Sequence, residues 1–203
     1  MLERGTARLE AFSDGVFAIA ATLLILEIGV DSSRGDLGSQ LAHIWPAYLA
    51  YATTFLIIGV IWLNHHHCVS LIGLVDRTFL FINLLLLLTI SFMPFPTKLV
   101  AEYLQKPGER DAVIAYAVTM LTMAVVYNVW WRYARNSRRL IADGVSDRSL
   151  RAVDRAFNPG VPSYALVLGV AFVSPLASVL ITLGIAVFYL PSAALFERGG
   201  EPL

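Results

Sequence analysis

The sequence predicts an all-α membrane protein whose helices form a single domain over residues 1–203. Hydrophobic residues make up 57% of the chain, charged residues make up 15%, and the mean hydropathy is +0.68, values typical of a polytopic membrane protein. Acidic and basic residues are absent from residues 37–75, 78–97, 112–131 and 156–196, which are 39, 20, 20 and 41 residues long. About 20 apolar residues make one spanning helix, and the last segment has room for two. With an N-terminal helix, the sequence therefore predicts six transmembrane helices.

The first helix is expected over residues 7–30 and is polar for a spanning segment. Only twelve uncharged residues separate Asp14 from Glu27, fewer than a lone spanning helix needs. The helix must therefore include Arg8, Ser13, Asp14 and Glu27, and lipid tolerates such groups only where they face protein or water. Before the apolar residues 15–26, Glu3, Glu10 and Asp14 outweigh Arg4 and Arg8, which argues against a cleaved signal peptide, since such a peptide has a positively charged lead. We expect this helix to be retained and to lie at the centre of a bundle.

Prolines mark the ends of other helices. The second helix is expected over residues 41–72, with Pro46 in its first turns, where proline costs little. The third is expected over residues 78–104, and Pro94 near its far end should kink or close it. The remaining expected elements are a fourth helix over 110–135, a short interfacial helix over 147–157, and two short helices within 161–191 divided near Ser174 and Pro175.

The basic residues are concentrated on one side of the predicted membrane. Seven lie in the polar loop over residues 132–158: Arg132, Arg135, Arg138, Arg139, Arg148, Arg151 and Arg155. With six alternating spans, Arg4, Arg8, Arg77 and Arg198 join them, and Arg34, Lys98, Lys106 and Arg110 lie opposite. Because cytoplasmic loops carry an excess of Lys and Arg, this distribution predicts a cell-membrane protein with both termini in the cytoplasm.

The arginine-rich loop has an alternative interpretation as a site for nucleic acid or anionic lipid. The interleaved Asp143, Asp147 and Asp154 favour a solvated topology determinant instead. The formal net charge of the chain is +0, so no global field indicates nucleic acid as a partner. The one cysteine, Cys68, excludes an internal disulfide framework.

The spacing of residues on the first helix produces one continuous apolar face. At about 100° per residue, the side chains of Leu23, Leu26 and Val30 lie within about 40° of Ile19, with Thr22 about 60° to one side. Ser13 and Asp14 point roughly 120–140° away, toward neighbouring helices, where Asn64, His65 and His66 at the end of the second helix are candidate partners. On spacing alone, ordinary packing or lipid contact explains the apolar face best.

Two motifs resemble those of the transmembrane protein 175 family of potassium-permeable channels. Arg8, Phe12, Ser13 and Asp14 form R-x-x-x-F-S-D, which G-V-F-A-I-A-A-T-L-L-I-L-E follows, and Trp62, His65 and His66 form W-x-x-H-H. The resemblance implies a homotetramer of six-span subunits whose first helices line a central pore. It also implies that Ile19, Leu23 and Leu26 line the narrow part of the pore, with the Thr22 hydroxyl close by. Arg8, Phe12, Ser13, Asp14, Trp62 and His65 would support the pore helix.

The same resemblance implies weak selectivity for potassium. A ring of four Ile19 side chains would form a hydrophobic gate that an ion passes at least partly hydrated. The chain also has no T-V-G-Y-G filter loop. We therefore expect K⁺ and other monovalent cations as permeant ions, and no cofactor. Four copies of Glu27 would concentrate cations at the outer mouth, although a carboxylate that reaches up to water explains Glu27 equally well.

Three consecutive histidines raise the question of a metal site or a proton pathway. His65, His66 and His67 point in directions about 100° apart, whereas chelation by a helix requires i and i+4 spacing, so no metal site is expected. A role in sensing pH stays open. The alternative function is a proton-coupled secondary transporter that uses Asp14 and these histidines. No nucleophile and base occur at workable spacing, so we do not expect an enzyme.

Overall fold

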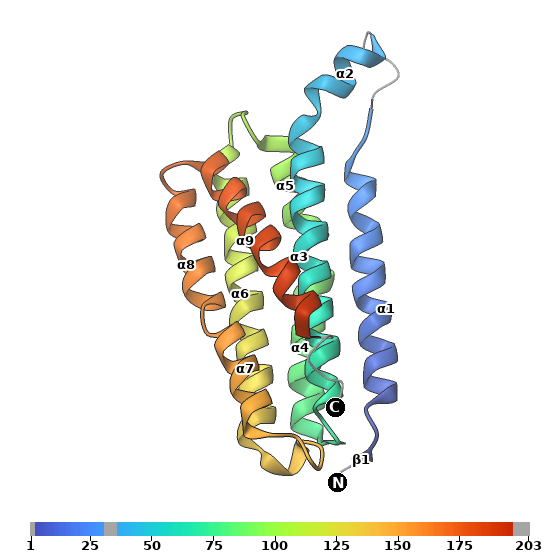
Figure 1. Ribbon diagram of the computed structural model, residues 1–203. Coiled ribbons are helices and arrows are strands. Elements are labelled where there is room, and N and C mark those ends of the chain that lie inside the picture. The colour runs from blue at the N-terminus through green and yellow to red at the C-terminus, as the bar shows by residue number, and fades with distance from the viewer. Residues whose placement is uncertain (1–2, 31–35, 197–203) are drawn as a thin grey trace.

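Long apolar helices run side by side through the computed structural model, which describes residues 3–30 and 36–196 (Figure 1). The α-helices are α1 (Ala7–Leu23), α2 (Leu37–His43), α3 (Trp45–Ser70), α4 (Arg77–Phe92), α5 (Pro94–Tyr103), α6 (Glu109–Asn136), α7 (Asp147–Phe157), α8 (Gly160–Ala171) and α9 (Pro175–Phe196). The 3₁₀-helices η1 (Leu24–Glu27) and η2 (Arg138–Leu140) and the strands β1 (Glu3–Arg4) and β2 (Leu74–Val75) complete the described elements. Most of the loop expected around residues 31–36, with Arg34, lies outside the described residues, as does Arg198.

Among the described residues, four segments are long and apolar enough to cross a membrane: Ala7–Glu27, Trp45–Ser70, Arg77–Tyr103 and Glu109–Asn136. The protein is therefore an all-α, multi-pass membrane protein. Helix α8 has 12 residues, which is below the length of a full span, whereas α9 has 22 uncharged residues. The expected division of this region near Ser174 and Pro175 is confirmed, because α8 and α9 flank it. Whether both helices cross the membrane stays a prediction.

Helix α1 ends earlier than the sequence predicted. It tightens into η1 after Leu23, and the chain becomes extended at Ile28, with φ −94° and ψ 99°. Val30 therefore does not continue the helical face of Ile19, and the prediction of a helix to residue 30 was wrong by three residues. A 3₁₀ turn commonly closes an α-helix, since its tighter bonds satisfy the last carbonyl groups.

Prolines divide the second and third predicted helices. The second was expected from residue 41, but the chain breaks at Ile44, and α3 begins at Trp45 with Pro46 in its first turn. In the third, α4 ends at Phe92 and α5 begins at Pro94, as the expected kink required. The cause is the same in both, because a proline has no N–H for the preceding turn and fits best at a helix start.

The kink before α5 places a hydroxyl cluster inside the bundle. The hydroxyl oxygen of Thr54 on α3 lies 3.0 Å from that of Thr97 on α5 and 2.9 Å from that of Tyr116 on α6. All three side chains are buried. Since a buried hydroxyl without a partner is costly, these bonds link α3, α5 and α6 in one register.

Backbone pairing ties three loops together at the end of the bundle where the N-terminus lies, called here the β end (Figure 1). Strand β1, before α1, pairs antiparallel with β2, between α3 and α4. Next to β2, the N–H of Gly73 donates to the carbonyl of Leu140, and that of Ala142 donates to Leu71, each at 2.9 Å. A Cβ at Gly73 would lie 3.0 Å from Cα of Ala142, so glycine permits this approach. The loop before α1 is thus connected through β2 to the segment after α6.

Asp76 holds the same end together with its side chain. It caps α4 by accepting from the Phe79 N–H at 2.8 Å, and it accepts from the Tyr133 hydroxyl and the Arg139 guanidinium at 2.9 Å each. Burial of the carboxyl opposes ionisation. The Phe79, Tyr133 and Arg139 donors outweigh this effect and hold the pKa of Asp76 below its ordinary value.

Candidate functional site

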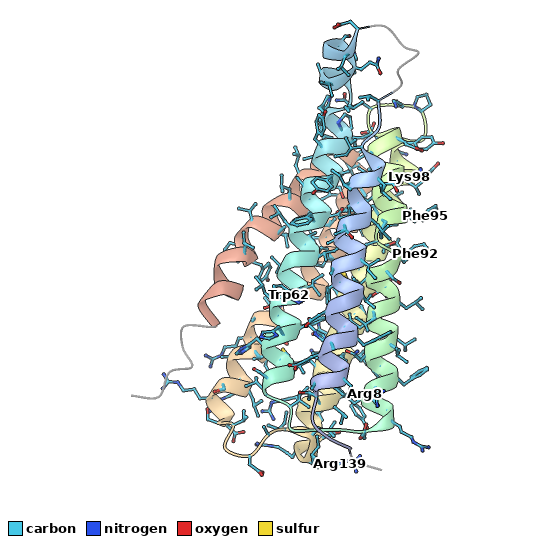
Figure 2. The ribbon with its side chains drawn as sticks, turned by 90° about the vertical axis from the view of Figure 1, so that its right-hand side faces the viewer. Arg8, Trp62, Phe92, Phe95, Lys98 and Arg139 are labelled. Carbon is cyan, nitrogen blue, oxygen red and sulfur yellow. The ribbon has the colours of Figure 1, made fainter. Side chains whose placement is uncertain are left out.

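Helix α1 has one face in the bundle and one face outside it (Figure 2). Phe17, Ala20 and Leu24 are buried, and α1 packs against α3 and α4. The other face is formed by Ile19, Leu23 and Leu26, whose side chains are 61%, 41% and 71% exposed within the subunit. The apolar face derived from the spacing thus exists and has no cover within the described part of the subunit.

Thr22 is also exposed and lies beside this face. Its hydroxyl donates to the backbone carbonyl of Ile19 at 3.0 Å. This bond uses the hydroxyl hydrogen, so only the acceptor side of the oxygen is left for a ligand. Such an oxygen suits contact with a cation or with the water around it.

The residues of the R-x-x-x-F-S-D motif divide between the two faces of α1. Ser13 is buried, whereas Arg8 and Phe12 are exposed. Helix geometry places Phe12 within about 20° of Ile19, so it extends the uncovered face instead of packing inside the subunit. Among the described residues Arg8 forms no ion pair, with Asp14 or with any other carboxylate. Both side chains lie outside the interior of the subunit, and the expected support of the pore helix by Arg8 and Phe12 stays a prediction.

Ser13 belongs to a buried chain of polar side chains that joins three helices. The Asn83 amide on α4 donates to the Ser13 hydroxyl at 3.1 Å, and its carbonyl oxygen lies 3.1 Å from Nε2 of His65 on α3. Ser13 is 0% exposed, Asn83 is 3% exposed and His65 is 1% exposed. Aromatic rings enclose the imidazole: Trp130 stacks on it with centroids 4.9 Å apart, and the Phe17 ring lies 5.4 Å away. This chain fixes the rotation of α1 about its axis.

Asp14 forms a second polar link between α1 and α3. The indole Nε1 of Trp62 donates to Oδ1 of Asp14 at 2.8 Å. Trp62 also lies beside His66, with ring centroids 6.2 Å apart. The sequence correctly directed the side chains of Ser13 and Asp14 toward neighbouring helices, and Asp14 does bond to the second predicted helix, whereas Ser13 bonds to α4, the third. Their direct partners, however, are Asn83 and Trp62, with His65 one bond further on.

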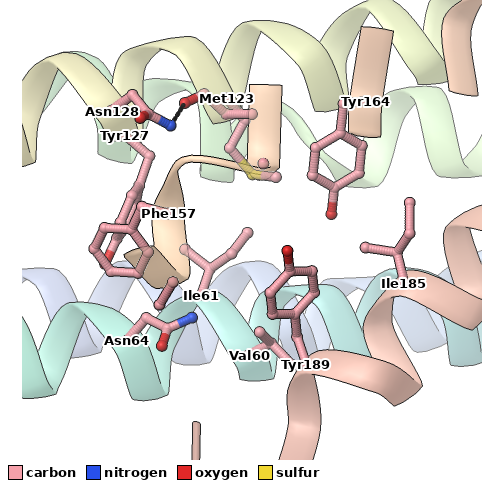
Figure 3. A pocket seen from close by; sticks show the side chains of 13 residues that line it. Val60, Ile61, Asn64, Met123, Tyr127, Asn128, Phe157, Tyr164, Ile185 and Tyr189 are labelled. Atoms are coloured by element: carbon pink, nitrogen blue, oxygen red, sulfur yellow. Dashed lines mark hydrogen bonds between the residues drawn. The ribbon is translucent and has the colours of Figure 1, made fainter. Parts of the chain in front are cut away.

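The histidines and Asn64 diverge as the helical spacing indicated. His65 is buried in the polar chain and His66 is exposed. Asn64 lines a cavity of about 90 Å³ between α3, α6 and α9, which Tyr164 and Tyr189 also line (Figure 3). The expected contact of Asn64 with Ser13 or Asp14 is therefore not made.

Glu27, the candidate for cation attraction, is paired inside the subunit. Its carboxylate lies 3.3 Å from Nζ of Lys98 on α5, and its side chain is only 18% exposed. Lys98 also approaches Glu102 at 3.9 Å, and an open pocket of about 700 Å³ adjoins all three residues. In this arrangement the Glu27 charge is largely compensated, which weakens its attraction for a cation.

Three residues important to the site were not predicted as part of it: Asn83, Trp130 and Lys98. A signal existed for Asn83, since it is the only carboxamide in the uncharged segment 78–97 and would be costly in lipid without a partner. The sequence gives no such signal for the stacking of Trp130 on His65, because that contact depends on how α3 and α6 pack.

The fold defines a multi-pass membrane protein. Its helix α1 lies at the edge of the subunit, held by hydrogen bonds of Ser13 and Asp14 on one side and uncovered on the other. Residues 8–94 match the family described as "Endosomal/lysosomal potassium channel TMEM175". A potassium channel of Chamaesiphon minutus is 40% identical over 188 residues, which cover 91% of this chain and 93% of the relative. The chain belongs to the TMEM175 family.

A solved structure supports the same relationship. The crystal structure of a lysosomal potassium-selective channel TMEM175 homolog from Chamaesiphon minutus matches with a TM-score of 0.84 at 38% identity, covering 93% of this chain and 97% of that one. A more distant relative is the endosomal/lysosomal proton channel TMEM175 of Gallus gallus, 33% identical over 135 residues, which cover 61% of this chain and 27% of that protein. These relatives are channels and not enzymes, in agreement with the sequence analysis.

Proposed function

We propose that this protein is a potassium-permeable, weakly selective cation channel. The observation that carries the proposal is the uncovered apolar face of α1 in a chain of the TMEM175 family. From Phe12 to Leu26 this face is about 21 Å long, a large part of the roughly 30 Å apolar slab. A helix anchored by buried polar bonds on one side and uncovered on the other suits a helix that meets its own copies around an axis.

In the proposed assembly four subunits surround the pore, and Ile19, Leu23 and Leu26 face the axis. Ile19 forms the narrow ring, where loss of water closes the pathway. The Thr22 oxygen contributes an acceptor next to this ring. Because none of these groups replaces the whole hydration shell of an ion, K⁺ passes with part of its water and selectivity is modest. The proposal requires K⁺ or another monovalent cation as the permeant ion. It requires no cofactor and no metal ion bound as a structural or catalytic ligand.

The polar links give α1 its orientation in this proposal. Ser13 and Asp14 hold the helix through Asn83 and Trp62, on the side away from Ile19. The proposed domain covers residues 1–203 with six spans. The excess of arginine at the β end directs this end and both termini to the cytoplasm.

Ion flux from liposomes tests this function. Purified protein is reconstituted with internal K⁺, and efflux is followed with and without a proton gradient. A channel releases K⁺ down its own gradient in both conditions, at a rate that rises with the K⁺ gradient. Efflux that requires the proton gradient would support the alternative, a proton-coupled transporter using Asp14 and His65–His67.

The name of the Gallus gallus relative makes proton permeation a second candidate, and the same liposomes test it. Internal pH is followed after an external pH step. A potassium ionophore is present so that K⁺ movement cancels the membrane potential that proton entry would otherwise build up. Protein-dependent acidification here, together with no protein-dependent K⁺ efflux in the liposomes without ionophore, would replace the potassium proposal. Chemical cross-linking followed by mass measurement gives the number of subunits, and a final product other than a tetramer would contradict the proposed pore.

A further inference from the structure

Helix α7 carries a row of arginines on the side opposite its buried face. Helix geometry places Arg148, Arg151 and Arg155 within about 60° of one another, and Leu150 and Val153 on the opposite side. The three arginine side chains are exposed, whereas Leu150 and Val153 are buried. Over seven residues this arginine row is about 10 Å long.

Two carboxylates of α7, Asp147 and Asp154, are engaged by residues outside this helix. Asp154 accepts from Nε1 of Trp131 at 2.7 Å and lies 3.4 Å from Nε of Arg135, both on α6. Asp147 lies 2.6 Å from the Arg138 guanidinium. Within the described residues no carboxylate forms an ion pair with the arginine row. Asp147 and Asp154 therefore form no ion pair with the arginine row, which leaves its guanidinium groups available to an anionic ligand.

The position of α7 brings the row to a membrane surface. Helix α6 has 28 residues and is about 42 Å long, so it extends beyond a 30 Å apolar slab, and its uncharged part ends at Trp131. The bond from Trp131 to Asp154 sets the last turn of α7 level with this boundary. Helix α8 begins three residues after α7, at Gly160, with an apolar sequence (Figure 1). Arg155 thus lies near the headgroups, and Arg148 lies about 10 Å further out.

We propose that the arginine row of α7 binds the anionic headgroups of phospholipids in the membrane leaflet at the β end. A guanidinium donates two parallel hydrogen bonds to a phosphate, which makes arginine well suited to this ligand. The adjoining α8 keeps the row next to the bilayer, where headgroups are far more concentrated than any free phosphate. Each basic residue near an anionic surface strengthens binding about fivefold, so the three together contribute roughly 100-fold.

Lipid binding to the purified protein in a non-ionic detergent tests this inference. Native mass spectrometry measures the affinity for short-chain phosphatidylglycerol and, as a neutral comparison, phosphatidylcholine of the same chain length. The variants are R148Q/R151Q/R155Q, the charge-conserving R148K/R151K/R155K, and the single change Arg151→Gln. Arg110→Gln is the matched control, since Arg110 is also exposed but lies at the other end of α6. Circular dichroism and elution volume verify that each variant is folded.

We expect the triple glutamine variant to lose roughly 100-fold in phosphatidylglycerol affinity, Arg151→Gln about fivefold, and Arg110→Gln little. The lysine variant keeps the charge but not the paired hydrogen bonds of guanidinium, so its loss should be smaller than that of the triple glutamine variant. If the triple glutamine variant does not fold, the single change decides. Equal affinity for the neutral lipid, or unchanged affinity in the glutamine variants, would overturn the inference. Competition by inorganic phosphate at the concentration of the lipid would assign the row to free phosphate, and tighter binding of a short RNA would assign it to nucleic acid. The inference does not depend on ion conduction, so it stands or fails separately from the proposed channel.

Discussion

The indole nitrogen of Trp62 and the carboxylate of Asp14 are joined by a hydrogen bond of 2.8 Å, which fastens the uncovered helix α1 to α3. Trp62 lies three residues before His65, which is in the buried chain through Asn83 to Ser13. Two successive residues of α1, Ser13 and Asp14, are therefore held by two different helices. The rotation of α1, and with it the direction of the Ile19 face, depends on both links.

Trp62→Phe removes the donor to Asp14 and keeps an aromatic ring. We expect a loss of about 1 kcal/mol in the free energy of unfolding, because hydrogen bonds to charged groups contribute 1.5–3 kcal/mol when buried and this one is partly exposed to solvent. Thermal unfolding in detergent measures the change. Trp45→Phe is the control, since Trp45 is similarly exposed and no hydrogen bond of its indole is found among the described residues. Equal losses in both variants would show that the bond to Asp14 contributes nothing.

Asn83→Leu leaves the Ser13 hydroxyl and the His65 imidazole without their partner in the bundle interior. We expect a destabilisation of about 1–2 kcal/mol, since hydrogen bonds between membrane helices are worth less than the full cost of an unsatisfied buried group. The thermal midpoint in detergent and the yield of assembled protein measure it. Asn128→Leu is the control, because among the described residues the Asn128 amide donates only to the carbonyl of Ala124 in its own helix. A midpoint for Asn83→Leu that equals the control would contradict the role of the chain.

Ile19→Asn tests the narrow point of the proposed pore. A polar side chain holds water where the isoleucine ring excludes it, so we expect potassium current in planar bilayers to rise several-fold and discrimination against sodium to fall. The matched control is Ile25→Asn, since Ile25 is also exposed but points about 120° away from Ile19. Unchanged current in the first variant would place the constriction elsewhere.

Lys98→Gln releases Glu27 from its ion pair at 3.3 Å. If α1 lines the pore, the freed carboxylates raise the local cation concentration, and we expect conductance to increase at low salt and return toward the original value above about 0.5 M, where charges are screened within a few ångströms. Lys106→Gln is the control, because its ammonium donates to the backbone carbonyl of Glu102. An increase that persists at high salt would point to a change of pore shape instead.

Asp76→Asn tests whether the charge of Asp76 stabilises the β end, through the pH dependence of the free energy of unfolding. Asparagine keeps the helix cap but loses the charge that faces Arg139, so we expect a loss of about 1 kcal/mol at pH 7. Because the folded-state pKa of Asp76 is lowered, the ionised carboxylate stabilises the fold above its ordinary pKa of about 3.9, and this contribution disappears as pH falls through the folded-state value. The difference between Asp76→Asn and the unmodified protein should therefore shrink below about pH 4.

Asp147→Asn is the control for the measurement of unfolding free energy against pH in Asp76→Asn. Its pair with Arg138 is exposed on both sides, with side chains 49% and 60% accessible, so its removal should change the free energy of unfolding by less than about 0.5 kcal/mol. Chemical denaturation in detergent between pH 3 and pH 8 gives both curves. A constant difference in the free energy of unfolding between Asp76→Asn and the unmodified protein across this range would show that the charge of Asp76 does not stabilise the β end.

Local chemistry made much of the helical plan predictable. Prolines have no N–H to donate, so Pro46, Pro94 and Pro175 fit best in the first turn of a helix, and each lies at a helix start. The angle between Ile19 and Ser13 follows from helix geometry alone, and so the apolar face and the inward direction of Ser13 were found before any packing was considered. The exact end of α1 was not, because the change to a 3₁₀ turn at Leu24 depends on what surrounds it.

The sequence by itself determined an all-helical membrane protein, its family, and the two sides of α1, because hydropathy and helical periodicity are properties of neighbouring residues. Only the tertiary structure decided the partners: Asn83 for Ser13, Trp62 for Asp14, and Lys98 for Glu27. The physical reason is that hydrogen bonds and ion pairs reach only about 3–4 Å, so they depend on which helices touch and at what height, and residues as far apart as 13 and 83 carry no local record of that contact.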